Sequence, residues 1–254
     1  MKIGFIGTGI IGSAMIRGLC RAEIENLSLI ISERSKKNSE ELKNEFPDKI
    51  TVTADNQKIA DESEWIVLSV LPKQAEEVLK ELKFTKDKKI INVVASLPLD
   101  VIEDITGGVA EIVDVVPLPF CAKGFGPIIV YPPSKEASEI LSNMGDIVQA
   151  ESAKEMAVLR SITGMMSPYY MLIASLVEWS VKEGVSEENA RKYITEFSGA
   201  LNRMSLDFDG DLKDLANEMT PGGLNWQALT YLEGKDNFKD WQDILDEIVK
   251  KVIK

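Results

Sequence analysis

The sequence predicts an α/β protein in which a doubly wound, mostly parallel sheet is followed by an all-helical second half. Up to about residue 150, short runs rich in β-branched residues alternate with longer amphipathic runs. This pattern is typical of strand–helix–strand units with helices on both faces of a sheet. A glycine-rich turn follows the first of these strands, and from residue 154 onward the apolar residues recur almost only with helical spacing.

In chain order, the first half consists of apolar strands separated by helices. Strands are predicted at residues 2–6, 27–31, 50–52, 65–71, 89–95, 112–116 and 128–131. Helices are predicted at residues 13–21, 37–46, 74–82, 99–105 and 135–144. Pro72 ends the fourth strand, because proline has no amide hydrogen to offer to a sheet.

The second half is predicted as helices at residues 154–162, 167–184, 187–207, 212–219, 225–233 and 240–252. Gly184 is typical of a helix end, and Ser186 is typical of the cap that opens the next helix. The change of pattern near residues 149–154 predicts two domains, residues 1–150 and residues 151–254.

The composition excludes several classes of function. The net charge is −12, which argues against a nucleic-acid partner because phosphate binding needs a basic face. The two cysteines, Cys20 and Cys121, have no ligand-like spacing, and the sequence contains no histidine. We therefore expect no disulfide framework, no metal site and no histidine-based triad. With no signal-peptide pattern and no apolar stretch long enough to span a bilayer, we expect a cytoplasmic protein without a membrane partner.

The strongest chemical motif is Gly7-x-Gly9-x-x-Gly12, which lies between a predicted strand and a predicted helix. In this setting Gly7 makes the tight turn, Gly9 lets the backbone approach a pyrophosphate, and Gly12 lets the helix pack on the strand. The unpaired amides at the start of the helix favour a phosphate group. The predicted Rossmann-type dinucleotide site is formed by Gly7, Thr8, Gly9, Ile10, Ile11 and Gly12.

The residues after the second strand bear on the choice between two nicotinamide cofactors. Glu33 could accept hydrogen bonds from the ribose hydroxyls of NAD. Arg34, Ser35 and Lys37 instead offer two cations and a hydroxyl to the 2′-phosphate of NADP. We favour NADP, because these three groups could all bind the 2′-phosphate, whereas the Glu33 carboxylate can rotate away from it. NAD is the alternative.

A second glycine turn, Thr220-Pro221-Gly222-Gly223, lies between two predicted helices. Backbone amides in such a turn can point into a concavity, and the helix that begins near Asn225 can add its own amides. The turn is therefore a candidate anion site for a substrate carboxylate. On local chemistry alone, it could equally be a plain helix–helix connection.

Taken together, these motifs resemble those of pyrroline-5-carboxylate reductases, the last enzymes of proline biosynthesis, over nearly the whole chain. The matching segments are Lys2 to Gly12, Ser32-x-Arg34-Ser35, Asp55-Asn56, Val70-Leu71-Pro72-Lys73-Gln74, Val116-Pro117-Leu118-Pro119 with Gly124-x-Gly126, Val181-Lys182-x-Gly184, and Thr220-Pro221-Gly222-Gly223. The resemblance implies that Asn56 reaches the cofactor and that Val70 and Pro72 lie near its nicotinamide. Ala95, at the end of its strand, is also expected to contact the cofactor. The resemblance further implies that the helical half forms a homodimer or a higher homo-oligomer.

The match is weaker in the substrate half. Asn225 stands where the family has a threonine beside the substrate ring, and Met165 and Met166 stand where small residues are usual. Asp114 and Leu118 replace an arginine and an asparagine of the family. These differences leave the identity of the substrate open.

Reduction of a cyclic imine needs an anchor for the carboxylate and a face for the ring, while the hydride comes from the cofactor. We expect Thr220 and the amides of Gly222 and Gly223 to form the anchor. Asn225 would hydrogen-bond near the ring without donating a proton, because an imine that is already protonated in water needs little acid catalysis. Thr163 is a further candidate, although its hydroxyl could equally cap a helix.

Three functions are consistent with these residues. The favoured one is the reduction of pyrroline-5-carboxylate to proline. The second is that of a related imine or keto reductase with a different substrate, and the third is a cofactor-binding paralogue without turnover. A hydroxyacid dehydrogenase is disfavoured, because residues 169–181 contain no lysine to act as its acid catalyst. The active site is expected where the strand ends of the first domain face the helices of the second.

Overall fold

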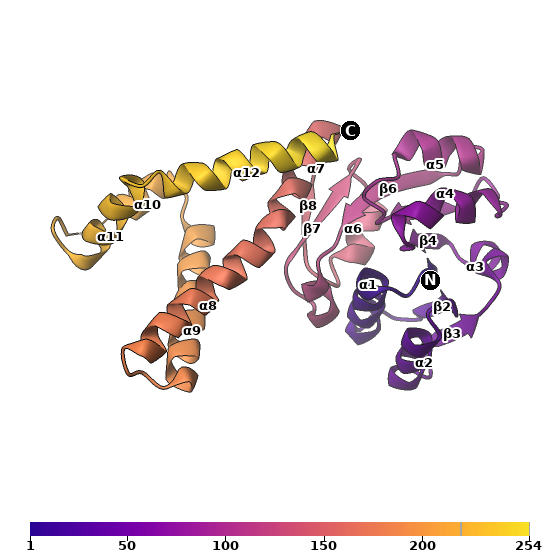
Figure 1. Ribbon diagram of the computed structural model, residues 1–254. Coiled ribbons are helices and arrows are strands. Elements are labelled where there is room, and N and C mark those ends of the chain that lie inside the picture. Colours follow the sequence, from indigo (N-terminus) through magenta and orange to yellow (C-terminus); the bar gives the residue numbers. More distant parts are fainter. Residues whose placement is uncertain (219, 254) are drawn as a thin grey trace. The chain divides into compact units, whose positions relative to one another are not determined.

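The structure is a computed structural model that describes residues 1–218 and 220–253 of the chain (Figure 1). It contains two compact units, Met1–Arg160 and Ser161–Lys254. This division lies later than the predicted boundary at residue 150, because Met156 packs with Ile129 and Ala150 of the first unit.

The first unit alternates strands with helices, as the sequence predicts. Its strands are β1 (Lys2–Ile6), β2 (Ser28–Ser32), β3 (Ile50–Thr53), β4 (Trp65–Leu68), β5 (Lys89–Asn92), β6 (Glu111–Val116), β7 (Pro127–Tyr131) and β8 (Asp146–Gln149). Its helices are α1 (Ile10–Arg21), α2 (Lys36–Glu45), α3 (Asn56–Glu62), α4 (Pro72–Lys80), α5 (Leu99–Thr106), the short 3-10 helix η1 (Pro119–Lys123), α6 (Lys135–Leu141) and most of α7 (Ala153–Ile162).

Within the described residues, the strands form one eight-stranded sheet in the order β3-β2-β1-β4-β5-β6-β7-β8. Neighbouring strands are parallel except for β6 and β7, which are antiparallel. The chain proceeds outward from β1 to β3 and then returns to place β4 on the other side of β1. This confirms the predicted Rossmann-type sheet, in which ligands bind outside the carboxyl ends of the strands at the reversal between β1 and β4.

Some elements differ from those that the hydrophobic pattern predicts. The predicted strands 65–71 and 89–95 end earlier, at Leu68 and Asn92. Asn92 ends β5 because its side-chain oxygen accepts a hydrogen bond from the amide of Val94 at 3.0 Å, which turns the chain into a loop. The elements α3, β8 and η1 are present in addition to those that were predicted.

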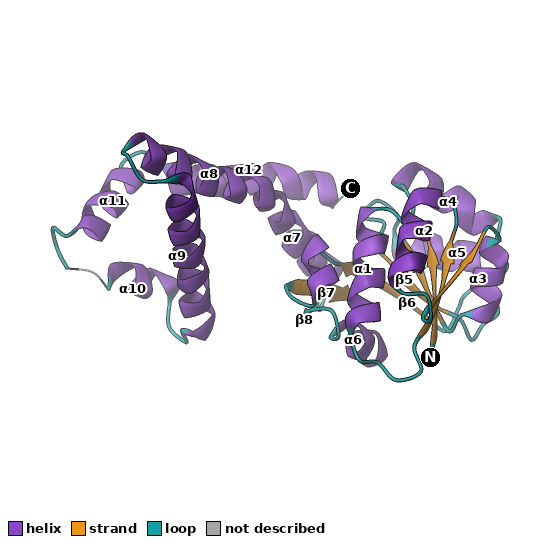
Figure 2. Cartoon of the chain, turned by 90° about the horizontal axis from the view of Figure 1, so that it is seen from below, coloured by secondary structure: helices purple, strands orange, loops and turns teal. Residues whose placement is uncertain are grey.

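The apolar side chains of each strand alternate between the two faces of the sheet, and helices cover both faces (Figure 2). Ile3 and Phe5 of β1 belong to one buried cluster with α1, α2 and α6, whereas Ile6 belongs to a second cluster with α3, α4 and α5. Gly4 lies on this second face, and a Cβ atom there would come within 2.5 Å of Ile59. The missing side chain therefore lets α3 pack directly on β1.

The second unit contains only helices and connecting turns in its described residues. They are the end of α7, the 3-10 helix η2 (Thr163–Met165), α8 (Met166–Lys182), α9 (Glu187–Asp207), α10 (Leu212–Asn217), α11 (Leu224–Glu233) and α12 (Asn237–Val252). Met219, the last residue of the predicted helix 212–219, lies outside the described residues.

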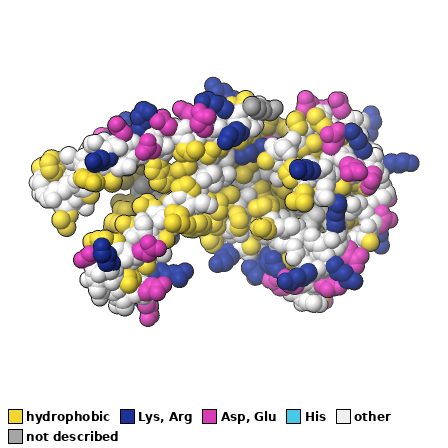
Figure 3. Space-filling model, in the orientation of Figure 1, with side chains coloured by type: hydrophobic (Ala, Val, Ile, Leu, Met, Phe, Trp, Pro, Cys, Tyr) yellow, Lys and Arg dark blue, Asp and Glu magenta, His cyan; other side chains and the backbone are white. Residues whose placement is uncertain are grey.

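Helices α8 and α9 form a hairpin whose connection has the predicted caps. Gly184 has a φ of +96°, which suits the end of a helix. At the start of α9, Ser186 Oγ accepts a hydrogen bond from the amide of Asn189 at 3.3 Å. Many apolar side chains of this unit are exposed, and Figure 3 shows hydrophobic side chains gathered over α8. Across the described ranges, no helix combines the length and the apolar character that a membrane crossing requires.

Candidate cofactor and substrate site

The loop between β1 and α1 is a tight turn whose geometry requires glycine. Gly7 has a φ of +108°, and a Cβ atom there would lie 2.4 Å from the backbone oxygen of Ser69. The Gly7 amide donates a hydrogen bond to Ser32 Oγ at 2.9 Å, and the Gly7 oxygen accepts one from Ser69 Oγ at 2.7 Å. The ends of β2 and β4 thus fix the turn from both sides. Ser32 opens the matched segment Ser32-x-Arg34-Ser35, but its hydrogen bond to the turn was not expected from the sequence, and Ser69 belongs to none of the matched segments.

Gly9 and Gly12 have the two different roles that the motif predicts. Gly9 is the N-cap of α1, and a Cβ atom added to it would meet nothing within 4 Å. Open space therefore lies beside the first amides of the helix. A Cβ atom at Gly12 would instead lie 2.7 Å from the Gly7 oxygen, so this glycine allows the helix to pack against the turn. Ile10 and Ile11 open the helix, and Ile10 is 81% exposed at its start.

Thr8, between Gly7 and Gly9 in the turn, has a buried hydroxyl group. Its Oγ1 atom has no hydrogen-bond partner among the described residues, although the side chain is almost fully buried. Its backbone oxygen accepts hydrogen bonds from Asn38 Nδ2 at 2.6 Å and from Ser13 Oγ at 3.0 Å. An unpaired hydroxyl next to free helix amides is the environment that a bound phosphate group would satisfy.

A hollow of about 420 Å³ lies at the carboxyl ends of β2 and β3. It is lined by Ser32, Glu33, Arg34, Lys36, Ala54 and Asn56. Because Ser32 also binds the Gly7 amide, the hollow adjoins the glycine turn. The structure thus brings three of the predicted residues, Glu33, Arg34 and Asn56, to one place. Ser35 is the N-cap of α2 and Lys37 lies within α2; neither lines the hollow, and the second cation is Lys36.

The remaining predicted cofactor residues follow β4 and β5. Val70 follows β4, and its amide would lie 2.9 Å from a Cβ atom at Gly7. Pro72 opens α4 in the first turn, where its missing amide hydrogen is not needed. Ala95 is exposed in the loop after β5, and its backbone oxygen accepts a hydrogen bond from Arg160 Nη1 at 3.1 Å.

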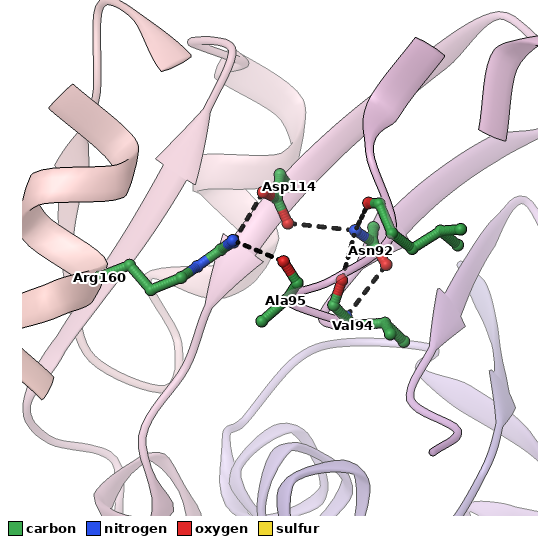
Figure 4. A network of polar contacts seen from close by, with 6 residues as sticks. Asn92, Val94, Ala95, Asp114 and Arg160 are labelled. Atoms are coloured by element: carbon green, nitrogen blue, oxygen red, sulfur yellow. Dashed lines mark hydrogen bonds and ion pairs between the residues drawn. The ribbon is translucent and has the colours of Figure 1, made fainter. Parts of the chain in front are cut away.

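Asp114 and Arg160 form an ion pair beside this loop (Figure 4). Arg160 Nη2 lies 2.6 Å from Asp114 Oδ2, and the two side chains are 13% and 14% exposed. Asn92 Nδ2 donates to the other carboxylate oxygen of Asp114 at 3.2 Å. Burial raises the pKa of the Asp114 carboxyl above its usual range, while the charge and hydrogen bond of Arg160 and the hydrogen bond from Asn92 oppose that rise. The carboxylate that replaces a family arginine is therefore paired within the protein.

The second glycine turn has a regular form. The Gly223 amide donates to the Thr220 oxygen at 2.9 Å, and Gly222 has a φ of +77°. With Pro221 at the second position, this is the residue pattern of a type II turn. Gly223 is the N-cap of α11, so the turn opens a helix as predicted. Because the Gly223 amide is used inside the turn, the amides without an intrahelical acceptor are those in the first turn of α11.

The other predicted substrate residues lie in the same unit. Asn225 is exposed in the first turn of α11. Thr163 begins η2 and is half-buried; the N-cap of η2 is Ile162, so Thr163 does not cap that helix. Met165 and Met166, at the junction of η2 and α8, are also half-buried. Leu118, in the first unit, is the residue before η1.

The two cysteines have no part in this site. Cys20 and Cys121 are buried free thiols. Burial raises the pKa of each thiol to about 11. At neutral pH both groups are therefore protonated and unsuited to nucleophilic chemistry.

Comparisons with known proteins agree with this geometry. Residues 2–96 match the family described as "NADP oxidoreductase coenzyme F420-dependent". The pyrroline-5-carboxylate reductase of Methanosarcina acetivorans is 29% identical over 251 residues, covering 91% of this chain and 89% of that protein. The NADP-bound crystal structure of Plasmodium falciparum pyrroline carboxylate reductase has a TM-score of 0.84 at 25% identity and covers 99% of this chain and 97% of its own. An imine reductase from Aspergillus terreus, with a TM-score of 0.55 and 17% identity, shares the fold. The resemblance predicted from the motifs is thus confirmed, because the chain is similar to pyrroline-5-carboxylate reductases along about nine-tenths of its length.

Proposed function

We propose that this chain is an NADPH-dependent reductase that converts pyrroline-5-carboxylate, a small cyclic imine carboxylate, to proline. The observation that carries the proposal is the glycine turn, where open space beside Gly9 adjoins a hollow with two cations, Arg34 and Lys36. Similarity to reductases of this substrate over about nine-tenths of the chain supports the same activity. When bound, NADPH supplies the hydride for the reduction.

The residues of the first unit fit NADP at two places. The first amides of α1 and the Thr8 hydroxyl would bind the pyrophosphate. Arg34 and Lys36 would bind the 2′-phosphate, and Asn56 lines the same hollow. Lys36 is 4.0 Å from Glu40 on the exposed side of α2, a weak pairing that leaves it available for a phosphate. Glu33 is the residue in the hollow that would favour NAD.

The second glycine turn would hold the substrate carboxylate. The Thr220 hydroxyl and the amides in the first turn of α11 are suited to an anion. Of the two predicted amides, that of Gly223 donates to the Thr220 oxygen inside the turn, so the Gly222 amide and the first amides of α11 would form the anchor. Asn225 would hydrogen-bond to the substrate without transferring a proton. Thr163 stays a further candidate for substrate contact.

The activity can be tested with the purified protein, pyrroline-5-carboxylate and either NADPH or NADH, following the absorbance of the reduced cofactor. We expect turnover at ordinary enzyme rates and a preference for NADPH. Tight NADPH binding without turnover of any cyclic imine would overturn the proposal and favour a cofactor-binding paralogue. Turnover of another imine alone would favour the second candidate, a related imine reductase, for which the observation is the exposed Asn225 in place of the family threonine.

The cofactor preference can be tested with Arg34→Ala. A hydrogen bond to a charged group contributes about 1.5–3 kcal/mol, so NADPH should bind roughly 10- to 150-fold more weakly. NADH should bind as before, because it has no 2′-phosphate. Lys37→Ala is the matched control, since Lys37 is an exposed cation in the first turn of α2, close to Arg34 in the sequence, that does not line the hollow. An unchanged NADPH affinity in Arg34→Ala would remove Arg34 from the 2′-phosphate site.

We also propose that a second copy of the chain covers the helical unit. Helix α9 buries Ala190 and Ile194. It also carries an exposed apolar stripe with helical spacing, formed by Tyr193, Phe197, Leu201 and Met204. The stripe lies on the same face of α9 as Ala190 and Ile194, so this apolar face is only partly covered within the chain. A second copy in a symmetric dimer would cover the rest of it.

The oligomeric state can be measured by light scattering after gel filtration. We expect a dimer or a larger homo-oligomer, and a shift towards the monomer in Phe197→Glu. Glu196→Gln, which changes a neighbouring exposed side chain outside the stripe, should leave the mass unchanged. A monomeric wild-type protein would contradict the proposal. The cytoplasmic location stays a prediction of the sequence.

A further inference from the structure

The loop that follows β5 lies at the carboxyl edge of the sheet, beyond the reversal between β1 and β4. A dinucleotide crosses a doubly wound sheet at this reversal. Because the hollow with Arg34 lies on the β2–β3 side, the nicotinamide end of the cofactor falls on the β4–β5 side. Ala95 and Ser96 form the exposed tip of the loop on that side. The position of this tip therefore bears on where the nicotinamide ring can sit.

Side chains from three other elements of the first unit hold the loop (Figure 4). Arg160, near the end of α7, donates from Nη1 to the Ala95 oxygen at 3.1 Å and from Nη2 to Asp114 at 2.6 Å. Asp114 on β6 accepts a hydrogen bond from Asn92 Nδ2 at 3.2 Å. The same amide group donates to the Val94 oxygen inside the loop, also at 3.2 Å. The contacts close a ring that passes through the loop, the sheet and α7.

We propose that Arg160, held by Asp114, is a positioning residue that fixes the Ala95 loop against the nicotinamide end of the cofactor. Guanidinium is suited to this task, because its planar fork of donors can bind a carboxylate and a carbonyl at the same time. The low exposure of both side chains leaves the pair little screened by solvent. The inference rests on the proposed NADPH site and adds to it a residue that touches neither cofactor nor substrate.

The test compares two ligands of the full-length protein. NADPH carries the nicotinamide, whereas 2′,5′-ADP carries only the adenosine end with its 2′-phosphate. In Arg160→Met, which keeps the aliphatic stem and removes both hydrogen bonds, NADPH should bind about tenfold more weakly, the effect of one hydrogen bond to a charged group. The affinity for 2′,5′-ADP should not change. The turnover number should fall further than the affinity, because a misplaced ring loses reactive alignment.

Three further variants separate positioning from folding. Arg160→Lys keeps the charge opposite Asp114 but lacks the fork, so it should retain the thermal stability and still bind NADPH weakly. If Arg160→Met fails to fold, the double variant Asp114→Asn with Arg160→Met removes both buried charges together and should fold. Arg21→Met is the matched control. Arg21 also bridges a backbone oxygen, that of Ala122 at 2.8 Å, and a carboxylate, that of Glu45 at 2.7 Å.

The outcomes distinguish this inference from the proposed function. If wild-type protein binds both ligands and Arg160→Met binds NADPH as tightly as wild type, the positioning role is overturned and the NADPH site stands. An equal loss of affinity for both ligands would mean that Arg160 has a structural role only. If the wild-type protein binds neither ligand, the NADPH site fails and this inference fails with it.

Discussion

Replacing Gly9 by alanine tests whether the space at the start of α1 is a cofactor site. The Gly9 backbone has a φ of −70° and a ψ of −167°, which alanine adopts without strain. The added methyl group would meet nothing within 4 Å in the protein. The small loss expected for alanine at an N-cap is offset by the lower entropy of its unfolded chain. We therefore expect the free energy of unfolding to change by less than about 0.5 kcal/mol.

The same methyl group would occupy the space through which a pyrophosphate approaches the amides of α1. Losing one hydrogen bond between a phosphate and an amide costs about 1.5–3 kcal/mol. This corresponds to roughly 10- to 150-fold weaker binding of NADPH. Calorimetric titration with NADPH and urea unfolding of the same sample would measure the two quantities separately.

Gly12→Ala is the control that should behave in the opposite way. Its Cβ atom would lie 2.7 Å from the backbone oxygen of Gly7, which accepts a hydrogen bond from Ser69 Oγ at 2.7 Å. We expect the variant to lose about 1–3 kcal/mol of unfolding free energy even without cofactor. A folded Gly9→Ala protein that bound NADPH with wild-type affinity would refute the reasoning, because the open space would then not be the path of the pyrophosphate.

Further predictions concern stability alone. Gly18→Ala would place a Cβ atom 2.3 Å from a backbone oxygen of η1, so urea unfolding should show a loss of about 1–3 kcal/mol. Gly199→Ala, in open space on α9, should instead be neutral or stabilising by up to about 1 kcal/mol, and a loss would contradict the geometry. Hydrogen bonds from Lys89 and Trp65 hold the pKa of Glu136 below its usual 4.5. The ionised Glu136 therefore stabilises the folded protein above about pH 4.5, and this contribution is lost as the pH falls through the lower pKa of the folded state. In Glu136→Gln, the free energy of unfolding should fall less steeply below pH 4.5, and at pH 7 it should be lower by no more than about 1 kcal/mol. If the fall below pH 4.5 is unchanged, the ion pair of Glu136 is not its source.

The parts of the fold that follow from local rules could be predicted from the sequence. The turn at Gly7 needs a positive φ and close contact with Ser69, and only glycine satisfies both. Helix α3 is short, and its hydrophobic pattern gave no signal. A signal was nevertheless present, because Asp55 caps the helix by accepting a hydrogen bond from the Gln57 amide at 2.9 Å. Strand β8 has little buried surface at the edge of the sheet, so it lacks the apolar alternation that identifies a strand.

The contacts that position side chains could not be predicted in this way. Arg160 and Asp114 are 46 residues apart, and each looks like an ordinary charged residue in its own segment. They meet because β6 follows β5 in the sheet and α7 returns to the same edge, which is a property of topology and not of spacing. The sequence alone also does not identify which lysine lines the hollow. Lys36 and Lys37 are equivalent in the sequence, and only the start of α2 decides that Lys36 lines the hollow.

The differences from the family pattern therefore carry unequal weight for the choice of substrate. At position 114, a negatively charged aspartate replaces a positively charged arginine of the family. The carboxylate would not repel an anionic substrate, because Arg160 pairs with it inside the protein. This replacement is compatible with a substrate that carries a carboxylate. Asn225 is different, since its side chain is exposed in the first turn of α11, beside the amides that suit an anion. If the chain reduces an imine other than pyrroline-5-carboxylate, Asn225→Thr is the single change expected to move its selectivity towards that substrate, whereas Asp114→Arg would place two like charges together and disrupt the loop.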